Sequence, residues 1–236
     1  MIPDDFKLTA NQTRARNAVV TKKPFISEKL SAELAKIQWP VYYLDFETMS
    51  TAIPLYDNTA PYATVPIQYS IHKCLASGNI EDHFEYIADP TEDCRRQFAE
   101  NLVNHLGQKG SIIMYTSFEK TVINKLADRF PELSVKLQSL VDRLVDMWAI
   151  IYKNIYHYDF HGSTSLKRVL PVMAPDMSYE KLNIKEGSTA SVTFTYMALG
   201  KYGAEDIDRL RKDLLEYCKQ DTLAMVKLHE RLAQMT

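Results

Sequence analysis

The stretch Val41-Tyr42-Tyr43-Leu44-Asp45-Phe46-Glu47-Thr48 decides the fold, because it places two carboxylates at the end of an otherwise apolar run. Such a run is typical of a central strand that is buried on both faces. Side chains alternate across a strand, so Asp45 and Glu47 point the same way. Two like charges about 4 Å apart repel by roughly 4 kcal/mol at an effective dielectric constant near 20. A bound cation would let both stay ionised, so the pair predicts a hard-metal site.

The composition sets bounds on the class of protein. The 236 residues are enough for one large domain, or for one domain with extensions. Because no apolar run approaches about 18 residues, we expect no membrane span, and the opening residues lack the pattern of a signal peptide. The three cysteines form no C-x-x-C pair and predict a reduced, cytoplasmic protein. A formal net charge of -2 does not by itself indicate nucleic-acid binding, although a local basic groove is compatible with it.

The chain divides into two parts by composition. Residues 1–35 are polar, with a basic cluster from Arg14 to Lys23, and are expected to form an extended arm or the remnant of an upstream domain. Residues 36–236 are expected to form the main domain. In it the runs 41–47, 67–75 and 83–87 are predicted strands, the last two joined by a Ser-Gly-Asn hairpin turn. A helix is expected to begin at Asp89-Pro90, and a short apolar strand follows at 111–115.

The order of the remaining elements predicts the fold class. Helical spacing recurs at 118–130, 133–140, 163–171, 190–199 and 204–234, with a short strand and helix between 143 and 152. A three-strand meander followed by alternating helices and strands predicts an α/β fold, namely an RNase H-like mixed sheet with flanking helices. Strand 41–47 would be central, and its carboxylates would lie at the sheet edge where α/β proteins bind ligands.

The last predicted helix contributes a third carboxylate. Asp221 lies within an apolar stripe with steps of three or four residues: Ile207, Leu210, Leu214, Tyr217, Asp221, Met225, Leu228 and Leu232. A carboxylate in a core-facing position is uncommon unless it is paired or binds a metal. Tyr217 lies one turn earlier on the same face. The alternative is a stripe shifted by one position, which would move Asp221 to its edge.

Two further acids are weaker candidates. Glu119 follows the strand at 111–115, where it could complete a metal site. However, Thr116-Ser117-Phe118-Glu119 also fits a capping box, in which Glu119 caps the start of the helix. The interpretation of Glu119 as a metal ligand is favoured only because Asp45, Glu47 and Asp221 are also present. Asp146 is the reserve acid, and a helix cap or a surface position is the more common role for such a residue.

Three motifs together resemble those of a known superfamily. Asp45-x-Glu47, an acidic residue near Phe118 after a strand, and Tyr217-x-x-x-Asp221 resemble the motifs of the DEDD 3′–5′ exonucleases, whose fold is RNase H-like. The tyrosine four positions before the last aspartate resembles the DEDDy branch. Most of the chain from Leu44 to Val226 is similar to the bacterial domain of unknown function 2779 family. The matching stretches are 44–48, 66–72, 118–120, 165–171 and 217–222. Glu119 departs from the usual aspartate.

The resemblance implies a metal-dependent 3′–5′ exonuclease that hydrolyses phosphodiester bonds of DNA or RNA by a two-metal mechanism. It implies two Mg²⁺ or Mn²⁺ ions held by Asp45, Glu47, Glu119 and Asp221, with Tyr217 orienting the attacking water. The implied partners are a single-stranded nucleic acid with a 3′ end and an upstream nuclease-like domain. The alternatives are a catalytically inactive RNase H-like module that binds nucleic acid or a partner, and an endonuclease with the same metal core.

Other polar residues have structural roles as their main alternative. Lys167 is a candidate phosphate contact, whereas a solvated helix lysine is equally common. Gln68, Tyr69 and His72, with Tyr62, lie near the first motif in sequence and are candidates for positioning a base or sugar, although core or loop roles are more common. His157 and His161 are followed by Gly162 and do not predict a zinc site. No nucleotide cofactor is expected, because neither G-x-x-x-x-G-K-[ST] nor G-x-G-x-x-G occurs.

Overall fold

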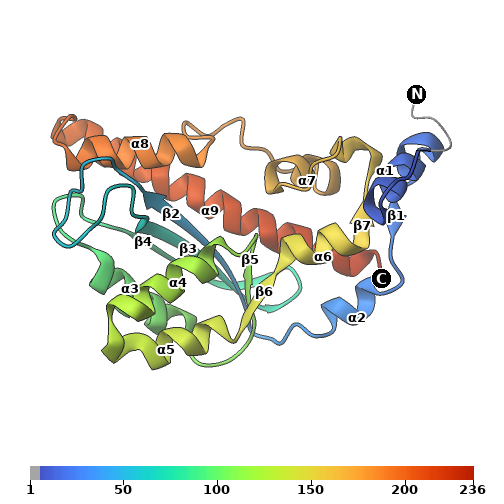
Figure 1. The fold of residues 1–236 in the computed structure, drawn as a ribbon, viewed down its shortest axis with the longest axis horizontal. Coiled ribbons are helices and arrows are strands. Elements are labelled where there is room, and N and C mark those ends of the chain that lie inside the picture. The colour runs from blue at the N-terminus through green and yellow to red at the C-terminus, as the bar shows by residue number, and fades with distance from the viewer. Residues whose placement is uncertain (1–5) are drawn as a thin grey trace.

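The computed structural model describes residues 6–236 and is built on a five-stranded mixed sheet in the order β4-β3-β2-β5-β6 (Figure 1). Its strands are β2 (Val41–Met49), β3 (Val65–Ala76), β4 (Asn79–Ile87), β5 (Ile112–Met114) and β6 (Leu144–Asp146). The strands β2, β3 and β4 form an antiparallel meander, whereas β5 runs parallel to β2 and β6 parallel to β5. The predicted α/β fold with a mixed sheet and flanking helices is confirmed, and β2 is central as expected.

Strand β2 is buried on both faces because helices cover each side of the sheet. On one face, Leu44 and Phe46 pack in a cluster with residues of α3 (Arg95–Leu106), α4 (Phe118–Arg129) and α5 (Pro131–Val141). On the other face, Val41 and Tyr43 pack in a cluster with residues of the long helix α9 (Ala204–Gln234). The alternation of side chains along β2 therefore sends its odd-numbered residues, including Asp45 and Glu47, toward α9.

Three shorter helices complete the α9 side and one end of the molecule. The helix α6 (Met147–Asn154) follows β6 directly, and a 3₁₀ turn, η1 (Tyr158–Phe160), precedes α7 (Leu166–Met173). Helix α7 packs on α9, and α8 (Gly187–Ala198) packs on both β2 and α9. Figure 1 shows α7 and α8 along the same side of α9. Within residues 6–236, no helix is long and apolar enough to cross a membrane.

The segment before residue 36 differs from the extended arm that the sequence predicts. It forms α1 (Ala10–Thr21), β1 (Phe25–Ile26) and α2 (Leu30–Leu34), and β1 pairs with β7 (Ile155–Tyr156). The helix α1 begins with a capping box, in which the Thr9 side chain and the Gln12 side chain each bond the other residue's backbone N–H. Residues 1–5 of the predicted arm lie outside the described residues.

One predicted helix boundary is also wrong. The helix α3 begins at Arg95, not at Asp89-Pro90. The Asp89 carboxylate accepts hydrogen bonds from the backbone N–H of Thr91 at 2.9 Å and from its hydroxyl at 2.6 Å. The Asp89 side chain therefore stabilises a local turn instead of capping a helix. Aspartate side chains often bond nearby backbone N–H groups in turns in this way.

Candidate metal centre

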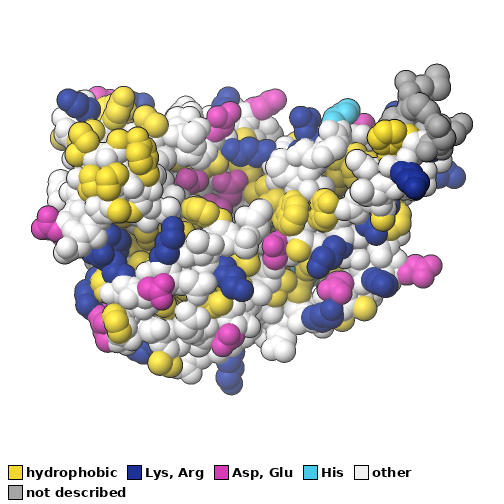
Figure 2. Space-filling model, viewed as in Figure 1, with side chains coloured by type: hydrophobic (Ala, Val, Ile, Leu, Met, Phe, Trp, Pro, Cys, Tyr) yellow, Lys and Arg dark blue, Asp and Glu magenta, His cyan; other side chains and the backbone are white. Residues whose placement is uncertain are grey.

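Three carboxylates meet where the middle of β2 faces the middle of α9. Asp45 and Glu47 come from β2 and Asp221 from α9, and one ligand atom from each lies within 4.8 Å of the others. Figure 2 shows acidic side chains gathered in a hollow below α8, near the centre of this face. The predicted position of Asp221 in the core-facing stripe of α9 is confirmed, since only 6% of its surface is exposed. The structure thus brings together the acids of the first and last motifs.

Burial is the main cause that raises the pKa of each of the three carboxylates. Glu47 is 8% exposed, and its burial followed by the charge of Asp221 raises its pKa to about 8. Burial and then the charges of Asp221 and Glu47 raise the pKa of Asp45 well above its ordinary value. Burial raises the pKa of Asp221 to about 6, against the hydrogen bond from Tyr179, which lowers it. Without a cation, therefore, ionising all three groups is costly.

Glu119 lies in the first turn of α4 beside this group. It is 3% exposed, and its negative charge adds to the raised pKa of Asp45. Burial raises the pKa of Glu119 to about 8, although hydrogen bonds from its own backbone N–H and from that of Phe46 lower it. The full capping box is wrong, because the N-cap residue Ser117 makes no side-chain capping bond. Within the described part of the chain, the Glu119 Oε2 atom is buried and has no hydrogen-bond partner.

The reserve acid, Asp146, has the structural role that was its alternative. It ends β6, and its Oδ1 atom accepts a hydrogen bond from the backbone N–H of Ala149 at 2.9 Å, which caps α6. Its charge reaches Glu119, whose pKa it raises, but it is not one of the three closely grouped acids.

Lys167 and two tyrosines border the carboxylates on the α9 side. The Lys167 Nζ atom donates to the Tyr217 hydroxyl at 3.0 Å and to the Lys185 carbonyl, and it lies over the rings of Tyr217 and Tyr179. Its positive charge lowers the pKa of both Glu47 and Asp221. Lys167 is therefore not simply a solvated helix lysine, because its ammonium group faces the acids.

Three further residues at this centre were not predicted from the sequence. The Tyr179 hydroxyl donates to the Asp221 Oδ1 atom at 2.5 Å, and the Cys218 thiol donates to the Asp45 Oδ2 atom at 3.3 Å. Gly187 begins α8 so close to Glu47 that an added Cβ would lie 3.4 Å from the Glu47 Oε2 atom. Cys218 could have been found from the sequence, because it follows Tyr217 on the same helix. Tyr179 and Gly187 lie in or beside a stretch without helical or strand periodicity, so the sequence offers no signal for them.

The predicted substrate residues near the first motif divide between the two faces of the sheet. Gln68 pairs with Glu47 across the strands, and its Nε2 atom donates to the Leu214 carbonyl, so it lies near the centre but is fully buried. The neighbouring Tyr69 lies on the opposite face, where its hydroxyl bonds His105. His72 is buried and its Nδ1 atom bonds the Thr222 hydroxyl. Tyr69 and His72 are therefore core residues, which corrects their predicted contact with a substrate.

The two remaining predictions concern loops. Tyr62 is 72% exposed in the segment between β2 and β3 and has a positive φ of 59°. His157 precedes the turn η1, and its Nδ1 atom accepts from the backbone N–H of Asp159 at 3.1 Å. His161 follows the same turn in the left-handed conformation, so the two histidines are not on one face of an α-helix.

Three curated proteins are similar to this chain over most of its length. Uncharacterized protein MG366 of Mycoplasma genitalium is 23% identical over 224 residues, which cover 86% of this chain and 33% of that protein. Its homologue in Mycoplasma pneumoniae is 24% identical, with the same shares covered. Uncharacterized protein UU173 of Ureaplasma parvum is 24% identical over 213 residues, which cover 81% of this chain and 31% of that protein. The chain spans about a third of the length of these relatives.

A family model covers the part of the chain that forms the sheet. It matches residues 42–165, more than half of the 236 residues, and includes β2 to β6 with Asp45, Glu47 and Glu119. The stretch thus holds the strands of the sheet and the acids of the first two motifs, whereas Asp221 lies beyond it. The chain belongs to the family described as a domain of unknown function, DUF2779.

Proposed function

We propose that this chain is a metal-dependent 3′–5′ exonuclease that hydrolyses phosphodiester bonds of DNA or RNA with two divalent ions. The observation that carries the proposal is the grouping of Asp45, Glu47 and Asp221 within 4.8 Å. A mixed sheet of three antiparallel and two parallel strands, with the acids on its central strand, supports the resemblance to RNase H-like nucleases. The tyrosine one turn before Asp221 supports the DEDDy branch.

The residues present fit a pair of hard cations. All the candidate ligands are carboxylates, which suit Mg²⁺ or Mn²⁺ rather than Zn²⁺. The partnerless, buried Oε2 atom of Glu119 is the kind of atom that a cation would satisfy. Asp45, Glu47 and Asp221 would hold the ions together with Glu119. When bound, the ions supply an activated water and stabilise the charge that develops on the phosphate.

The protein's own groups would orient the reactants. Burial and the nearby acids raise the pKa of Tyr217, so its hydroxyl stays protonated and acts by hydrogen bonding rather than as a base. Lys167 fixes that hydroxyl at 3.0 Å, and its ammonium group is suited to contact a phosphate oxygen. Tyr179 holds Asp221 in place through its hydroxyl.

The cover over the centre supports action at a chain end. The first residue of α8, Gly187, packs against Glu47, and α8 lies along β2. A centre covered on one side accepts a strand terminus more readily than the middle of a strand. We further propose a cytoplasmic location, which the three free, buried cysteines support, and an upstream nuclease-like domain as a partner.

Hydrolysis of labelled oligonucleotides tests the proposed function. Single-stranded DNA and RNA with a 5′ label are incubated with Mn²⁺, Mg²⁺ or EDTA, using the natural chain, Asp45→Asn and Asp208→Asn. Asp208 is an exposed acid on α9 and serves as the matched control. We expect stepwise shortening with metal for the natural chain and the control, and none for Asp45→Asn.

The other outcomes identify the alternatives. Immediate internal cleavage would indicate an endonuclease with the same metal core. Binding of oligonucleotides without any cleavage, at several metal concentrations, would contradict the proposal and favour the inactive binding module.

A further inference from the structure

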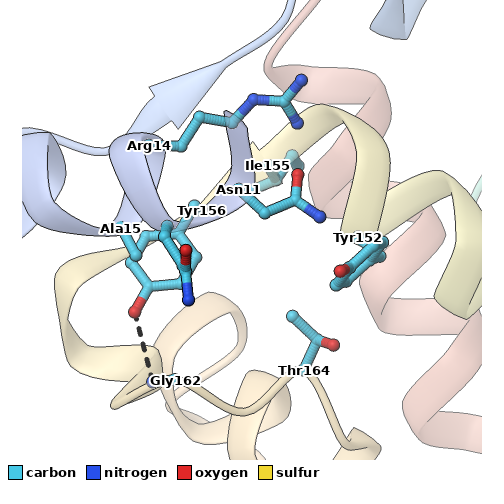
Figure 3. Close-up of a pocket in the computed structure, with 9 residues that line it drawn as sticks. Asn11, Arg14, Ala15, Tyr152, Ile155, Tyr156, Gly162 and Thr164 are labelled. Carbon is cyan, nitrogen blue, oxygen red and sulfur yellow. Dashed lines mark hydrogen bonds between the residues drawn. The ribbon is translucent and has the colours of Figure 1, made fainter. Parts of the chain in front are cut away.

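A pocket lies away from the carboxylates, at the end of the molecule that carries α1 (Figure 3). It has a volume of about 230 Å³ and lies between α1, the end of α6, β7 and the loop after η1. Pockets for drug-sized ligands usually measure about 300–1,000 Å³, so this one suits a smaller group. Nothing in the proposed hydrolysis uses it.

An exposed aromatic ring forms one wall of the pocket. Tyr152 is 42% exposed, and its ring stacks on that of Trp148 with centroids 4.8 Å apart and planes 17° apart. Trp148 is fixed in turn, because its Nε1 atom donates to the Thr164 hydroxyl at 2.8 Å. A flat ring held in place from beneath is the platform on which proteins stack the bases of single-stranded nucleic acids.

The pocket also offers polar groups that have no partner. Among residues 6–236, neither the side-chain amide of Asn11 nor the hydroxyl of Tyr152 has a hydrogen-bond partner, and Figure 3 shows Asn11, Tyr152 and Thr164 around the same space. An amide supplies both donors and an acceptor, which matches the edge of a nucleobase.

The segment that forms the other wall is basic, although the chain as a whole has a formal net charge of -2. Residues 6–24 contain no acidic residue and the following basic ones: Lys7, Arg14, Arg16, Lys22 and Lys23. Arg14 lines the pocket, and its Nη1 atom donates to the Lys153 carbonyl at 2.8 Å at the pocket's edge. Positive charge beside a stacking platform complements the phosphates that flank a base.

A short segment of chain connects the pocket with the metal centre. Thr164 lines the pocket, its carbonyl accepts from the Tyr115 hydroxyl at 2.6 Å, and Tyr115 directly follows β5. Lys167, three residues after Thr164, reaches Tyr217 at the carboxylates. The stretch from Thr164 to Lys167 therefore contacts the pocket at one end and the metal centre at the other.

We propose that this pocket binds a nucleobase of single-stranded nucleic acid, which stacks on Tyr152 while its strand extends to the carboxylates. This proposal rests on one part of the proposed function, namely that the chain acts on nucleic acid. It assigns Tyr152 and Asn11 to substrate binding at a distance from the reacting phosphate.

Binding measured in EDTA, where hydrolysis is not expected, tests this proposal. Fluorescence anisotropy gives the Kd of labelled oligo(dT) and oligo(rU), and of an oligonucleotide of abasic sites, for the natural chain and four variants. Tyr152→Ala removes the platform and should raise Kd about tenfold, whereas Tyr152→Phe keeps the ring and should stay within about twofold. Asn11→Asp places a carboxylate in the pocket and should also weaken binding. The helix α1 should still form, because a negative charge in the first turn of a helix is favourable. Tyr196→Ala, at a tyrosine 47% exposed on α8, is the matched control and should bind normally.

Each result decides the matter. Abasic strands that bind as tightly as normal ones, a Tyr152→Ala variant with an unchanged Kd, or no binding of any strand would overturn the proposal. Tyr152-dependent binding by a chain that hydrolyses nothing would support the pocket and contradict the exonuclease. Hydrolysis with a Kd indifferent to Tyr152 and Asn11 would support the exonuclease and contradict the pocket.

Discussion

Asp221 is the single residue through which α9 contributes a carboxylate to the candidate metal centre. It lies with Asp45 and Glu47 inside 4.8 Å, so its charge repels theirs when no cation is present. In EDTA at pH 8, Asp221→Asn should therefore unfold at a higher temperature than the natural chain. With millimolar Mn²⁺ the natural chain should gain stability, by about 2.7 kcal/mol at 100 times the Kd, and Asp221→Asn should gain little.

Differential scanning fluorimetry measures both effects. The control Asp208→Asn, on the exposed side of α9, should behave like the natural chain under both conditions. An Mn²⁺ shift of equal size in Asp221→Asn would show that Asp221 is not a ligand.

Tyr179 is the residue that holds Asp221 from the loop before α8. Its hydroxyl donates to Asp221 Oδ1, and its ring also lies under the Lys167 ammonium group. Groups that orient a metal ligand in this way usually contribute about 10–100-fold to metal affinity. Tyr179→Phe keeps the ring and should weaken Mn²⁺ binding by about tenfold in isothermal titration calorimetry. Tyr196→Phe is the control, and equal affinities for the two variants would rule out this role for Tyr179.

These residues differ in how far a sequence can reveal them. Asp45 and Glu47 are predictable because a strand has a period of two, and Asp221 because a helix has a period of 3.6. Tyr179 lies in a stretch with no period, so only the folded chain brings it to Asp221. Tyr69 is a candidate through its nearness to Gln68 in sequence, yet the same strand alternation sends it to the opposite face.

At the scale of elements, a buried polar network fixes α9 on β3. The Thr222 hydroxyl is 2.8 Å from the Ser70 hydroxyl and 2.8 Å from the His72 Nδ1 atom. Thr222→Val keeps the shape but leaves those two groups without this partner. The variant should lose about 1–3 kcal/mol of unfolding free energy.

Urea denaturation checks this loss, and Thr222→Ser, which keeps the hydroxyl, should lose less. Because the network lies beside the acids rather than among them, both variants should still bind Mn²⁺. If Thr222→Val lost metal binding but kept its stability, the result would contradict a purely structural role for His72, the residue that Thr222 bonds.

The N-terminal elements show why composition alone does not reveal a helix. A single residue of α1, Ala18, is buried, so the helix has no apolar stripe for a periodicity argument to find. Its start is marked by the Thr9 and Gln12 capping box, a signal that the basic, polar composition of the segment conceals. Composition indicates which residues prefer solvent, whereas a capping box indicates where a helix begins. For α1, only the capping box reveals the helix.

For the molecule as a whole, the fold gathers its chemistry at one edge of the sheet. The parallel strands β2, β5 and β6 run toward this edge. Asp45 lies at the middle of β2, Glu119 in the first turn of the helix after β5, and Asp146 at the end of β6. The central place of β2 could be predicted because the meander and the later alternation of helices and strands leave few arrangements. The positions of α7 and α8 could not, because loops of irregular sequence connect them to the sheet.

Two sets of buried groups give the stability of the whole molecule opposite dependences on pH. His72, His83 and His229 have pKa values lowered by burial to about 3, 4 and 4, so their contribution is lost as pH falls below the ordinary histidine value of 6.5. From about pH 7.5 upward these histidines are almost entirely neutral in both the folded and the unfolded chain. The carboxylates then determine the slope.

Glu47 and Glu119 have pKa values raised from 4.5 to about 8, so the folded chain binds more protons than the unfolded chain between those values. Their contribution is fully present below pH 4.5 and is lost as pH rises through 8. In EDTA, therefore, the unfolding free energy from urea denaturation should fall between about pH 6.5 and 8.5. Saturating Mn²⁺ should reverse this slope, because ligands must lose their protons to bind the ion. Glu47→Gln should flatten the slope in EDTA, whereas the exposed-site variant Asp208→Asn should not. A stability that rises with pH in EDTA would mean that the acids are stabilised as anions by the protein alone, without a cation.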